Sequence, residues 1–276
     1  MKHEALEGAK IAVAESARNV ACSGAEPLSV TNCLNFGNPM NPEIFWTLKK
    51  CVEGIRDACN AFDTPVSGGN VSLYNQNPKG AVDPTPVIGM VGLIDGWQPV
   101  SSNFKKEGDV ILVLGGTKEE LGGSEFLKTL FNIKSGLPPR LDLKEASTLV
   151  KLLVALAKKG LLQSAHDCAE GGLAVALAES CILAQGKEIG AKLDLAPEGV
   201  SKEAFLFGES QNRVVLSVSP EKLKAAEDMI KSMAYPHRIA GKVGGSVLEI
   251  GSLIKVPLTV LKQVWRTAIG GRMEKA

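Results

Sequence analysis

The sequence predicts an α/β protein of two successive domains, each with a mixed sheet and flanking helices. Helical and strand-like hydrophobic patterns alternate along both halves of the chain. The length of 276 residues exceeds that of a usual single hydrophobic core. A polar, turn-forming stretch over 95–109 separates the two alternating regions. We therefore place a domain boundary near Phe104, between domains at 1–104 and 105–276.

The second helix of the first half is the clearest predicted element. Asn41 can cap this helix, and Pro42 suits its first position because no backbone N–H is needed there. Apolar residues at spacings of three and four predict its buried face, namely Phe45, Leu48, Val52, Ile55, Cys59 and Phe62. The other predicted elements of this half are a helix over 4–22 and strands over 27–34, 64–66 and 85–94.

The second half repeats this alternation. It opens with the apolar run DVILVLG at 109–115, which is typical of a strand buried on both faces. The remaining predicted elements are helices over about 123–131, 144–159, 172–185 and 221–233, strands over 213–219 and within 237–257, and a short final helix. This order indicates a second α/β unit.

Charge and composition exclude several classes of protein. Lys plus Arg number 31 and Asp plus Glu number 30, so the chain has no excess positive charge to attract nucleic acid or an anionic membrane. No apolar run reaches the length of a transmembrane helix, and Glu4 and Glu7 interrupt the place where a signal peptide would be apolar. The six cysteines form no C-x-x-C pair, which favours buried thiols in a reducing compartment. We expect a cytoplasmic protein.

Four glycine-bearing segments lie where a predicted strand meets a turn or helix. They are Asn35–Pro39, Ser67–Ser72, Leu121–Glu125 and His166–Gly172. None of them matches the P-loop or the G-x-G-x-x-G fingerprint, which disfavours a P-loop kinase and an ordinary dinucleotide enzyme.

The segment SGGNVS at 67–72 is the most suggestive of the four. Gly68 and Gly69 leave backbone N–H groups uncovered, so phosphate oxygens can approach them closely. Asn70 offers a neutral oxygen ligand acceptable to Mg²⁺, and Ser72 offers a hydroxyl on the same side if the chain is extended. The alternative interpretation is a bulged strand end with a turn stabilised by asparagine.

Four other residues are weaker candidates. Adjacent strand residues point to opposite faces, so we expect Asp167 to cap a helix rather than to pair with His166. Glu209 and Arg213 form a charged cluster that fits either a site or a solvated loop. Glu125 and Glu209 are the acidic residues of glycine-bearing motifs that we would test by mutation, and no residue is assigned as the catalytic acid or base.

Taken together, these segments carry a family resemblance from about Gly8 to Leu258. The chain resembles the second half of the large subunit in the phosphoribosylformylglycinamidine synthase family, of the aminoimidazole ribonucleotide synthetase superfamily. The segments that carry it, in order, are AVAESARNVACSGAEPLSVTNCLNFGNPMNPE, TPVSGGNVSLYNQ, PTPVIGMVGLI, LGGSEFL, SAHDCAEGGLAVALAES and FGESQNRVV.

The resemblance implies an N-type α/β domain followed by a C-type α/β domain. It implies ATP-dependent amidation of formylglycinamide ribonucleotide, in which the amide oxygen is phosphorylated and ammonia then displaces phosphate. By the same resemblance Asn32, Gly68 and Gly69 contact ATP, Asn70 binds Mg²⁺ and Ser72 contacts the substrate. The partners that it implies are a separate synthase first half or a second copy of the chain, with a glutaminase and small accessory subunits.

Two departures from the family pattern matter. Asn32 stands where the family carries an aspartate, so a negative charge is lost while hydrogen bonding is kept. The family's first half is absent, and the N-type domain is expected to be truncated at its start, which leaves a sheet edge that needs covering.

Three functions follow as alternatives. The chain is half of a synthase that needs the other half for activity, or a non-catalytic nucleotide-binding or assembly module. The third alternative is a homodimeric relative that acts on another small substrate.

Overall fold

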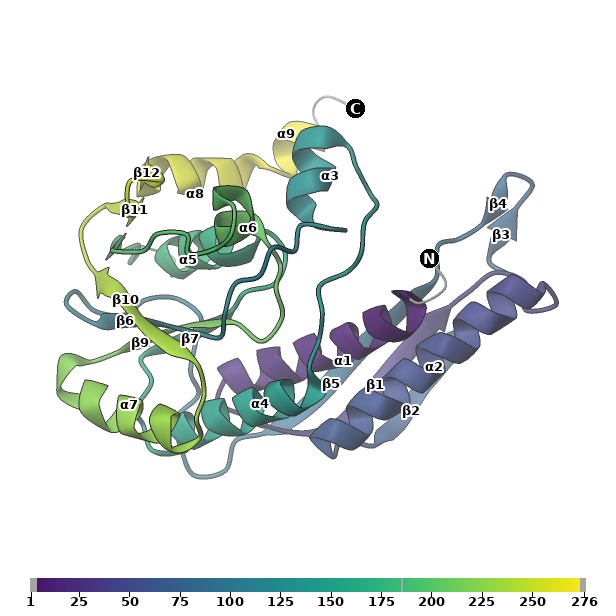
Figure 1. Cartoon of the computed structure of the whole chain (residues 1–276), viewed down its shortest axis with the longest axis horizontal. Helices are drawn as coiled ribbons and strands as arrows, with labels where there is room; N and C mark the ends of the chain where they lie inside the picture. Colours follow the sequence, from purple (N-terminus) through teal and green to yellow (C-terminus); the bar gives the residue numbers. More distant parts are fainter. Residues whose placement is uncertain (1–3, 185, 274–276) are drawn as a thin grey trace.

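A computed structural model describes residues 4–184 and 186–273, and it confirms the mixed α/β architecture. The first part of the chain forms a three-stranded sheet in the order β2-β1-β5. The central strand β1 (Glu26–Asn35) pairs in parallel with β2 (Val66–Ser72) and antiparallel with β5 (Thr85–Leu93). Helices α1 (Glu4–Cys22) and α2 (Pro42–Phe62) lie side by side over one face of this sheet (Figure 1).

The N-terminal start of α2 matches the sequence prediction, and its predicted buried face is confirmed in part. The Asn41 side chain accepts a hydrogen bond from the Glu43 amide and caps the helix, and Pro42 takes the first position. Phe45 and Val52, predicted as buried, are about half-exposed. The other four predicted residues pack in the core, and the smaller residues Cys51, Gly54 and Ala58 are buried as well.

Close packing of the two helices explains this difference. A Cβ atom on Gly54 would overlap the carbonyl oxygen of Leu6 and lie 3.0 Å from the Cβ atom of Ala9. Because α1 approaches α2 closely at this glycine, small residues of α2 face α1, while Phe45 and Val52 are left partly exposed.

The second part of the chain forms a seven-stranded sheet. Its strand order is β12-β11-β8-β10-β6-β9-β7. The strands are β6 (Val110–Leu114), β7 (Ser164–Asp167), β8 (Ala191–Leu193), β9 (Val214–Val218), β10 (His237–Val243), β11 (Val247–Ile250) and β12 (Ile254–Pro257). Both β6 and β9 are buried along their whole length, as the apolar run of β6 predicts.

Helices cover both faces of the large sheet. On one face Ile111 and Val113 pack with α5 (Gly172–Ile182) and α6 (Lys202–Phe207). On the other face Leu112 and Leu114 pack with helices α4 (Leu143–Lys158) and α7 (Leu223–Ser232). The remaining helices are α3 (Glu125–Phe131), the 3₁₀ turn η1 (Pro220–Lys222), α8 (Leu258–Thr267) and α9 (Gly270–Met273).

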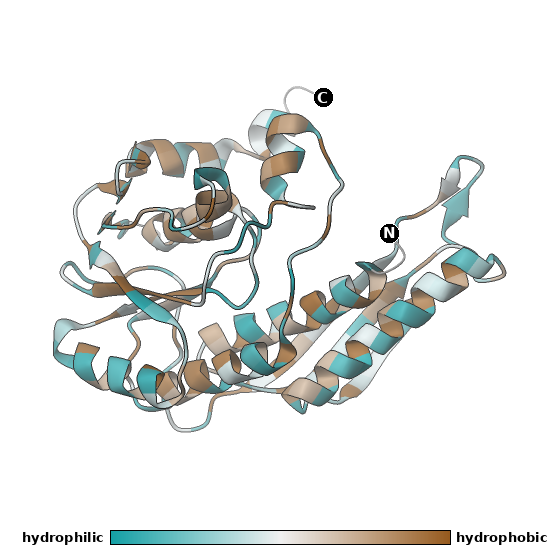
Figure 2. Ribbon diagram, viewed as in Figure 1, coloured by the Kyte–Doolittle hydropathy of each residue, from teal (hydrophilic) through white to brown (hydrophobic). Residues whose placement is uncertain are grey.

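Helix α1 connects the two parts of the molecule. Its residues Ala9 and Val13 pack in the core of the small sheet, whereas Ala17 and Ala21 pack in a core of the large sheet. In Figure 1 this helix runs alongside both α2 and α4, and Figure 2 shows hydrophobic and hydrophilic residues on different sides of all three helices. The C-terminal end of α1 therefore reaches the residues that follow β7.

The structure corrects one element of the predicted site. Residues 67–72, predicted as a loop, continue β2 as an extended strand paired with β1. A strand accommodates the two glycines because β2 is an edge strand that needs few packed side chains. The short hairpin of β3 (Gln76–Asn77) and β4 (Gly80–Ala81) was not predicted. Within the described residues, no helix is long and apolar enough to cross a membrane.

Candidate functional site

The small sheet leaves one of its faces uncovered by the described residues. Residues paired directly across strands share a face, so Asn70, Cys33 and Val87 form one row across this open face. Ser72, Asn35 and Thr85 form the next row. Helices α1 and α2 cover the opposite face, where Val30 and Leu34 are buried.

The open face changes character along its length. At the end where β1 finishes it presents polar groups, including the Asn70 amide and the Ser72 hydroxyl. Toward the other end it presents exposed aliphatic side chains, namely Leu28, Val91 and Leu93. The extended strand places Asn70 and Ser72 on the same side, as the sequence predicts for an extended chain.

The two glycines of β2 differ in their surroundings. A Cβ atom on Gly69 would overlap the Asn32 side-chain oxygen and lie 2.6 Å from the Asn32 carbonyl oxygen. Gly69 thus makes room for the side chain of Asn32. Gly68 faces open space, with no atom within 4 Å of a Cβ placed there.

Asn32 and Asn70 lie on opposite faces of the sheet. Asn32 pairs with Gly69 and Ile88, and Ile88 packs against the core beneath the helices. Both Gly69 and Asn70 are exposed because β2 is the edge strand. A ligand that touches both asparagines therefore has to pass round the outer edge of β2.

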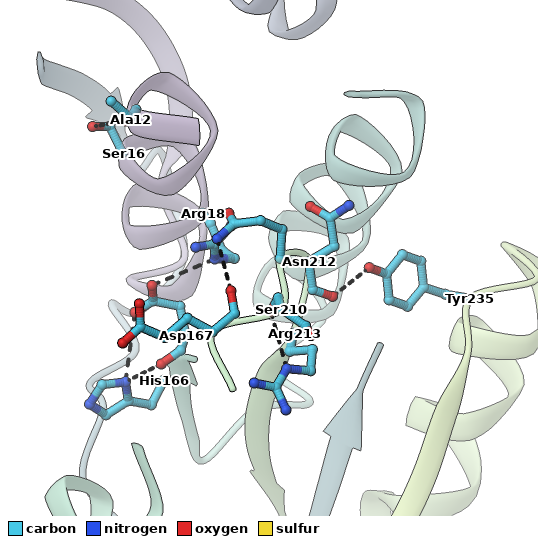
Figure 3. A network of polar contacts seen from close by, with 11 residues as sticks. Ala12, Ser16, Arg18, His166, Asp167, Ser210, Asn212, Arg213 and Tyr235 are labelled. Carbon is cyan, nitrogen blue, oxygen red and sulfur yellow. Dashed lines mark hydrogen bonds and ion pairs between the residues drawn. The ribbon is translucent and has the colours of Figure 1, made fainter. Parts of the chain in front are cut away.

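Two of the weaker candidates, Asp167 and Arg213, lie elsewhere, where α1 meets the large sheet (Figure 3). Arg18 on α1 is only 1% exposed, and its Nε lies 3.5 Å from Oδ2 of Asp167. The Arg18 Nη1 also donates to the side-chain oxygen of Gln211 at 3.3 Å. Asp167 therefore does not cap α5, whose N-cap is Gly171. The buried Arg18 guanidinium draws the carboxylate toward α1 instead.

His166 lies closer to Asp167 than the alternation of strand residues predicts. Its Nδ1 is 2.8 Å from the Asp167 carbonyl oxygen and 3.7 Å from Oδ1 of the same residue. Its Nε2 is 3.0 Å from a carboxylate oxygen of Glu179. Because β7 ends at Asp167, strict alternation of faces no longer holds there. Burial disfavours the charged imidazole, but Asp167 and Glu179 outweigh it and raise the His166 pKa to about 9.

Glu209 binds two of the glycine-bearing segments together. One carboxylate oxygen accepts hydrogen bonds from the backbone amides of Gly171, at 3.0 Å, and Glu125, at 2.9 Å. Burial raises the pKa of Glu209, while these two amides oppose the rise. The Glu125 carboxylate pairs with Lys128 at 2.6 Å. In these two segments the backbone amides of Gly171 and Glu125 are therefore already bound to a carboxylate of the protein.

Arg213 is buried and hydrogen-bonded within the protein, and it does not face an open site. Its buried guanidinium donates to the carbonyl oxygens of Ser210 and Gly208 and to the hydroxyl of Thr117. The interpretation of this segment as a solvated loop is therefore wrong, because Ser210, Gln211, Asn212 and Arg213 are all buried.

The described residues do not build a complete metal site. No group of three or more His, Cys, Asp or Glu side chains among them is arranged to hold a metal ion. The Asn70 amide oxygen is a suitable single ligand, because Mg²⁺ commonly combines one or two protein oxygens with phosphate oxygens and waters. Asn70 thus fits the cation as one member of a shell completed by a nucleotide, by water or by a partner.

Sequence comparisons place both parts of the chain in one family. The AIR synthase related protein family matches with its N-terminal domain over residues 2–94 and its C-terminal domain over 106–250. The phosphoribosylformylglycinamidine synthase subunit PurL of Thermoanaerobacter pseudethanolicus is 46% identical over 273 residues. That match covers 97% of this chain but 37% of the relative, so the chain spans just over a third of its length.

Solved structures share the fold. A Thermotoga maritima PurL complexed with ATP matches with a TM-score of 0.71 and 21% identity, over 95% of this chain and 42% of that chain. The same protein complexed with FGAR matches with a TM-score of 0.76 and 20% identity, over 95% of this chain and 44% of that chain. A HypE–HypF complex matches with a TM-score of 0.67 and 20% identity, over 90% of this chain and 83% of that chain.

Proposed function

Because the chain belongs to the AIR synthase related protein family, we propose that it forms one half of an ATP-dependent phosphoribosylformylglycinamidine synthase. The reaction is amidation of formylglycinamide ribonucleotide, with phosphorylation of its amide oxygen followed by displacement of phosphate by ammonia. The observation that carries the proposal is the uncovered polar end of the open face, where Asn70 and Ser72 lie on one side of an exposed edge strand.

Each residue of this face has a distinct proposed role. Asn70 provides one oxygen ligand to Mg²⁺, and that ion would neutralise charge on the triphosphate during phosphoryl transfer. Ser72 orients the substrate through its hydroxyl, which lies 3.3 Å from the Asn75 side-chain oxygen. Gly68 lets phosphate approach the backbone, since nothing occupies the space beside it. Asn32 and Gly69 contact the nucleotide round the edge of β2.

The exposed aliphatic end of the open face supports the need for a partner. Val91 and Leu93 are each more than half exposed on a single strand. Contiguous apolar surface of this kind is typical of an interface. We propose that the other synthase half covers this end, so that the polar end becomes one wall of an enclosed cleft. We extend the proposal to a glutaminase and small accessory subunits that deliver ammonia to the assembled pair.

Reconstitution tests this function. The chain is mixed with a separate polypeptide supplying the first half, and formation of the amidine from formylglycinamide ribonucleotide, ATP and ammonia is followed. We expect turnover from the mixture and at least tenfold less with Asn70→Ala, since a metal ligand would be lost. Thr31→Ala is the matched control, because Thr31 lies on the same face of the neighbouring strand β1 but pairs with Gly68 and Gly89. No turnover from any combination would contradict the proposal.

A second candidate function is nucleotide binding without turnover by the chain alone. The best acidic candidates are already engaged, because Asp167 pairs with Arg18 and Glu209 accepts two backbone amides. Calorimetry would show ADP binding to the isolated chain, and affinity unchanged in Asn70→Ala would favour this function over the first.

A homodimer acting on another small substrate is the third candidate. The fold match that covers 83% of the HypE-containing chain favours it, since a chain of about this size carries the same two-part fold there. Sedimentation that shows only a monomer would exclude this candidate.

A further inference from the structure

We propose that Cys33 is a positioning residue, which holds the Asn70 side-chain amide with its oxygen facing a nucleotide-bound divalent cation. The inference deepens the proposed function and rests on it, because Asn70 is the proposed cation ligand. Cys33 lies next to Asn70 in the central row of the open face, where β1 and β2 pair.

Hydrogen bonds link the side chains of this row to those of the next row. The Asn70 amide nitrogen donates to the Cys33 sulfur at 3.6 Å, which defines the direction of this bond. The Asn35 side-chain amide lies beside the same sulfur, with its oxygen at 3.9 Å and its nitrogen at 3.6 Å. The Asn35 amide nitrogen also donates to the carbonyl oxygen of Thr85 at 3.4 Å, which links these groups to β5.

This direction decides which end of the Asn70 amide can bind a cation. An amide presents a donor at one end and an acceptor at the other. The sulfur atom takes the nitrogen end, so the oxygen is turned away from β1 and toward the space over the face. With the amide reversed, its oxygen would face a thiol, which is only a weak donor, and its N–H groups would face the cation. Cys33 therefore favours the productive orientation before any ligand arrives.

The burial of the cysteines sets Cys33 apart. Cys22, Cys51, Cys59, Cys168 and Cys181 are all buried, whereas Cys33 is only partly covered. The five buried thiols fill core positions, as free cysteines usually do. A cysteine on a partly solvated strand face, in contact with two asparagine side chains, is better explained by its hydrogen bonds than by packing.

Nucleotide calorimetry on the full chain, with and without Mg²⁺, tests the inference. The quantity compared is the ratio of ADP affinities under the two conditions, because a general loss of fold would lower both. We expect Mg²⁺ to strengthen ADP binding to the parent chain. We expect Cys33→Ala to lower the ratio about two- to fivefold, the range that one modest hydrogen bond supplies. Cys33→Ser should restore it, because a hydroxyl also accepts from the amide.

Two further variants separate failure of this inference from failure of the proposed function. Asn70→Ala should remove the Mg²⁺ dependence, and Thr31→Ala should leave it at the parent value. The role of Cys33 would be overturned if Cys33→Ala keeps the parent's dependence of ADP affinity on Mg²⁺ while Asn70→Ala loses it. That result would leave Asn70 as the proposed cation ligand. If Asn70→Ala keeps the dependence, or the parent shows none, the cation site itself is wrong and the inference falls with it.

A spectroscopic readout reports the amide orientation directly. The side-chain NH₂ signals of Asn70 are identified in a ¹H–¹⁵N spectrum by their absence from Asn70→Ala. We expect two well-separated proton signals in the parent and in Cys33→Ser, because one proton faces the sulfur or oxygen acceptor. In Cys33→Ala the two signals should approach each other. Unchanged signals in Cys33→Ala would contradict the inference even if the affinities differ.

Discussion

Substitution Asp167→Asn removes the charged partner of a guanidinium that is almost completely buried. Arg18 retains its bond to Gln211, but its Nε and Nη2 have no hydrogen-bond partner in the described structure, so Asp167 supplies the compensating charge. Burial by itself raises the pKa of Asp167, but His166 and Arg18 outweigh it, and the pKa lies below its ordinary value. The carboxylate is therefore charged at neutral pH and opposes the Arg18 charge.

The expected cost follows from this burial. Breaking a buried ion pair by removing one partner typically costs 3–5 kcal/mol, because the remaining charge is left without compensation. The 3.5 Å separation is long for an ion pair, and asparagine keeps an acceptor, so we expect the lower end, about 3 kcal/mol. At roughly 2 °C per kcal/mol for a chain of this size, the unfolding midpoint should fall by about 6 °C.

Thermal unfolding followed by circular dichroism at pH 7 measures this effect. Asp228→Asn provides a matched control, because Asp228 pairs with Lys224 at 2.9 Å on the surface, with its side chain 60% exposed. Exposed pairs of this kind contribute about 0.5 kcal/mol or less, so the control should shift the midpoint by about 1 °C at most. If Asp167→Asn and Asp228→Asn shift the midpoint equally, the argument that Asp167 neutralises a buried charge is refuted.

Three further predictions concern His166 and the strands β1 and β2. The folded pKa of His166, about 9, exceeds the ordinary value of 6.5, so its stabilisation is complete below pH 6.5 and lost as the pH rises through 9. In urea titrations, His166→Gln should lower the free energy of unfolding by up to about 3 kcal/mol at pH 6 and by almost nothing at pH 10. A difference from the parent chain that is the same at both pH values would contradict this prediction. Gly69→Ala should destabilise by about 1–3 kcal/mol through its clash with Asn32. Gly68 has open space beside it, so Gly68→Ala should change the free energy of unfolding by no more than about 0.5 kcal/mol in the same urea titration. Equal destabilisation by Gly68→Ala and Gly69→Ala would contradict the predicted clash with Asn32. A small thiol reagent should modify only Cys33 of the six cysteines rapidly, and Mg²⁺ with ADP should slow the reaction; protection that persists in Asn70→Ala would count against the site.

Local sequence signals predict most of the fold. The Asn41-Pro42 start fixes α2, and the apolar run at 109–115 fixes β6, because capping and strand burial act over a few residues. Which side of α2 is buried depends on the approach of α1 at Gly54. That approach is a tertiary contact, and periodicity alone assigns the buried side to the larger residues.

The candidate site is predictable only in part. The shared side of Asn70 and Ser72 follows from the two-residue period of an extended strand. The opposite placement of Asn32 depends on the pairing register of β1 with β2, and the Asp167 partner comes from Arg18, far away in sequence. Neither pairing leaves a local signal. The Cys33 contact was missed for the same reason, since only the register brings it beside Asn70.

The most direct test is a crystal structure of the chain with Mg²⁺ and a non-hydrolysable ATP analogue. The proposed site requires the phosphates to lie over the polar end of the open face, with the Asn70 oxygen bound to the cation and Ser72 facing the ligand. It is contradicted if the phosphates bind instead beside Gly171 and Glu125 with Glu209 displaced, or if Asn70 contacts neither cation nor nucleotide.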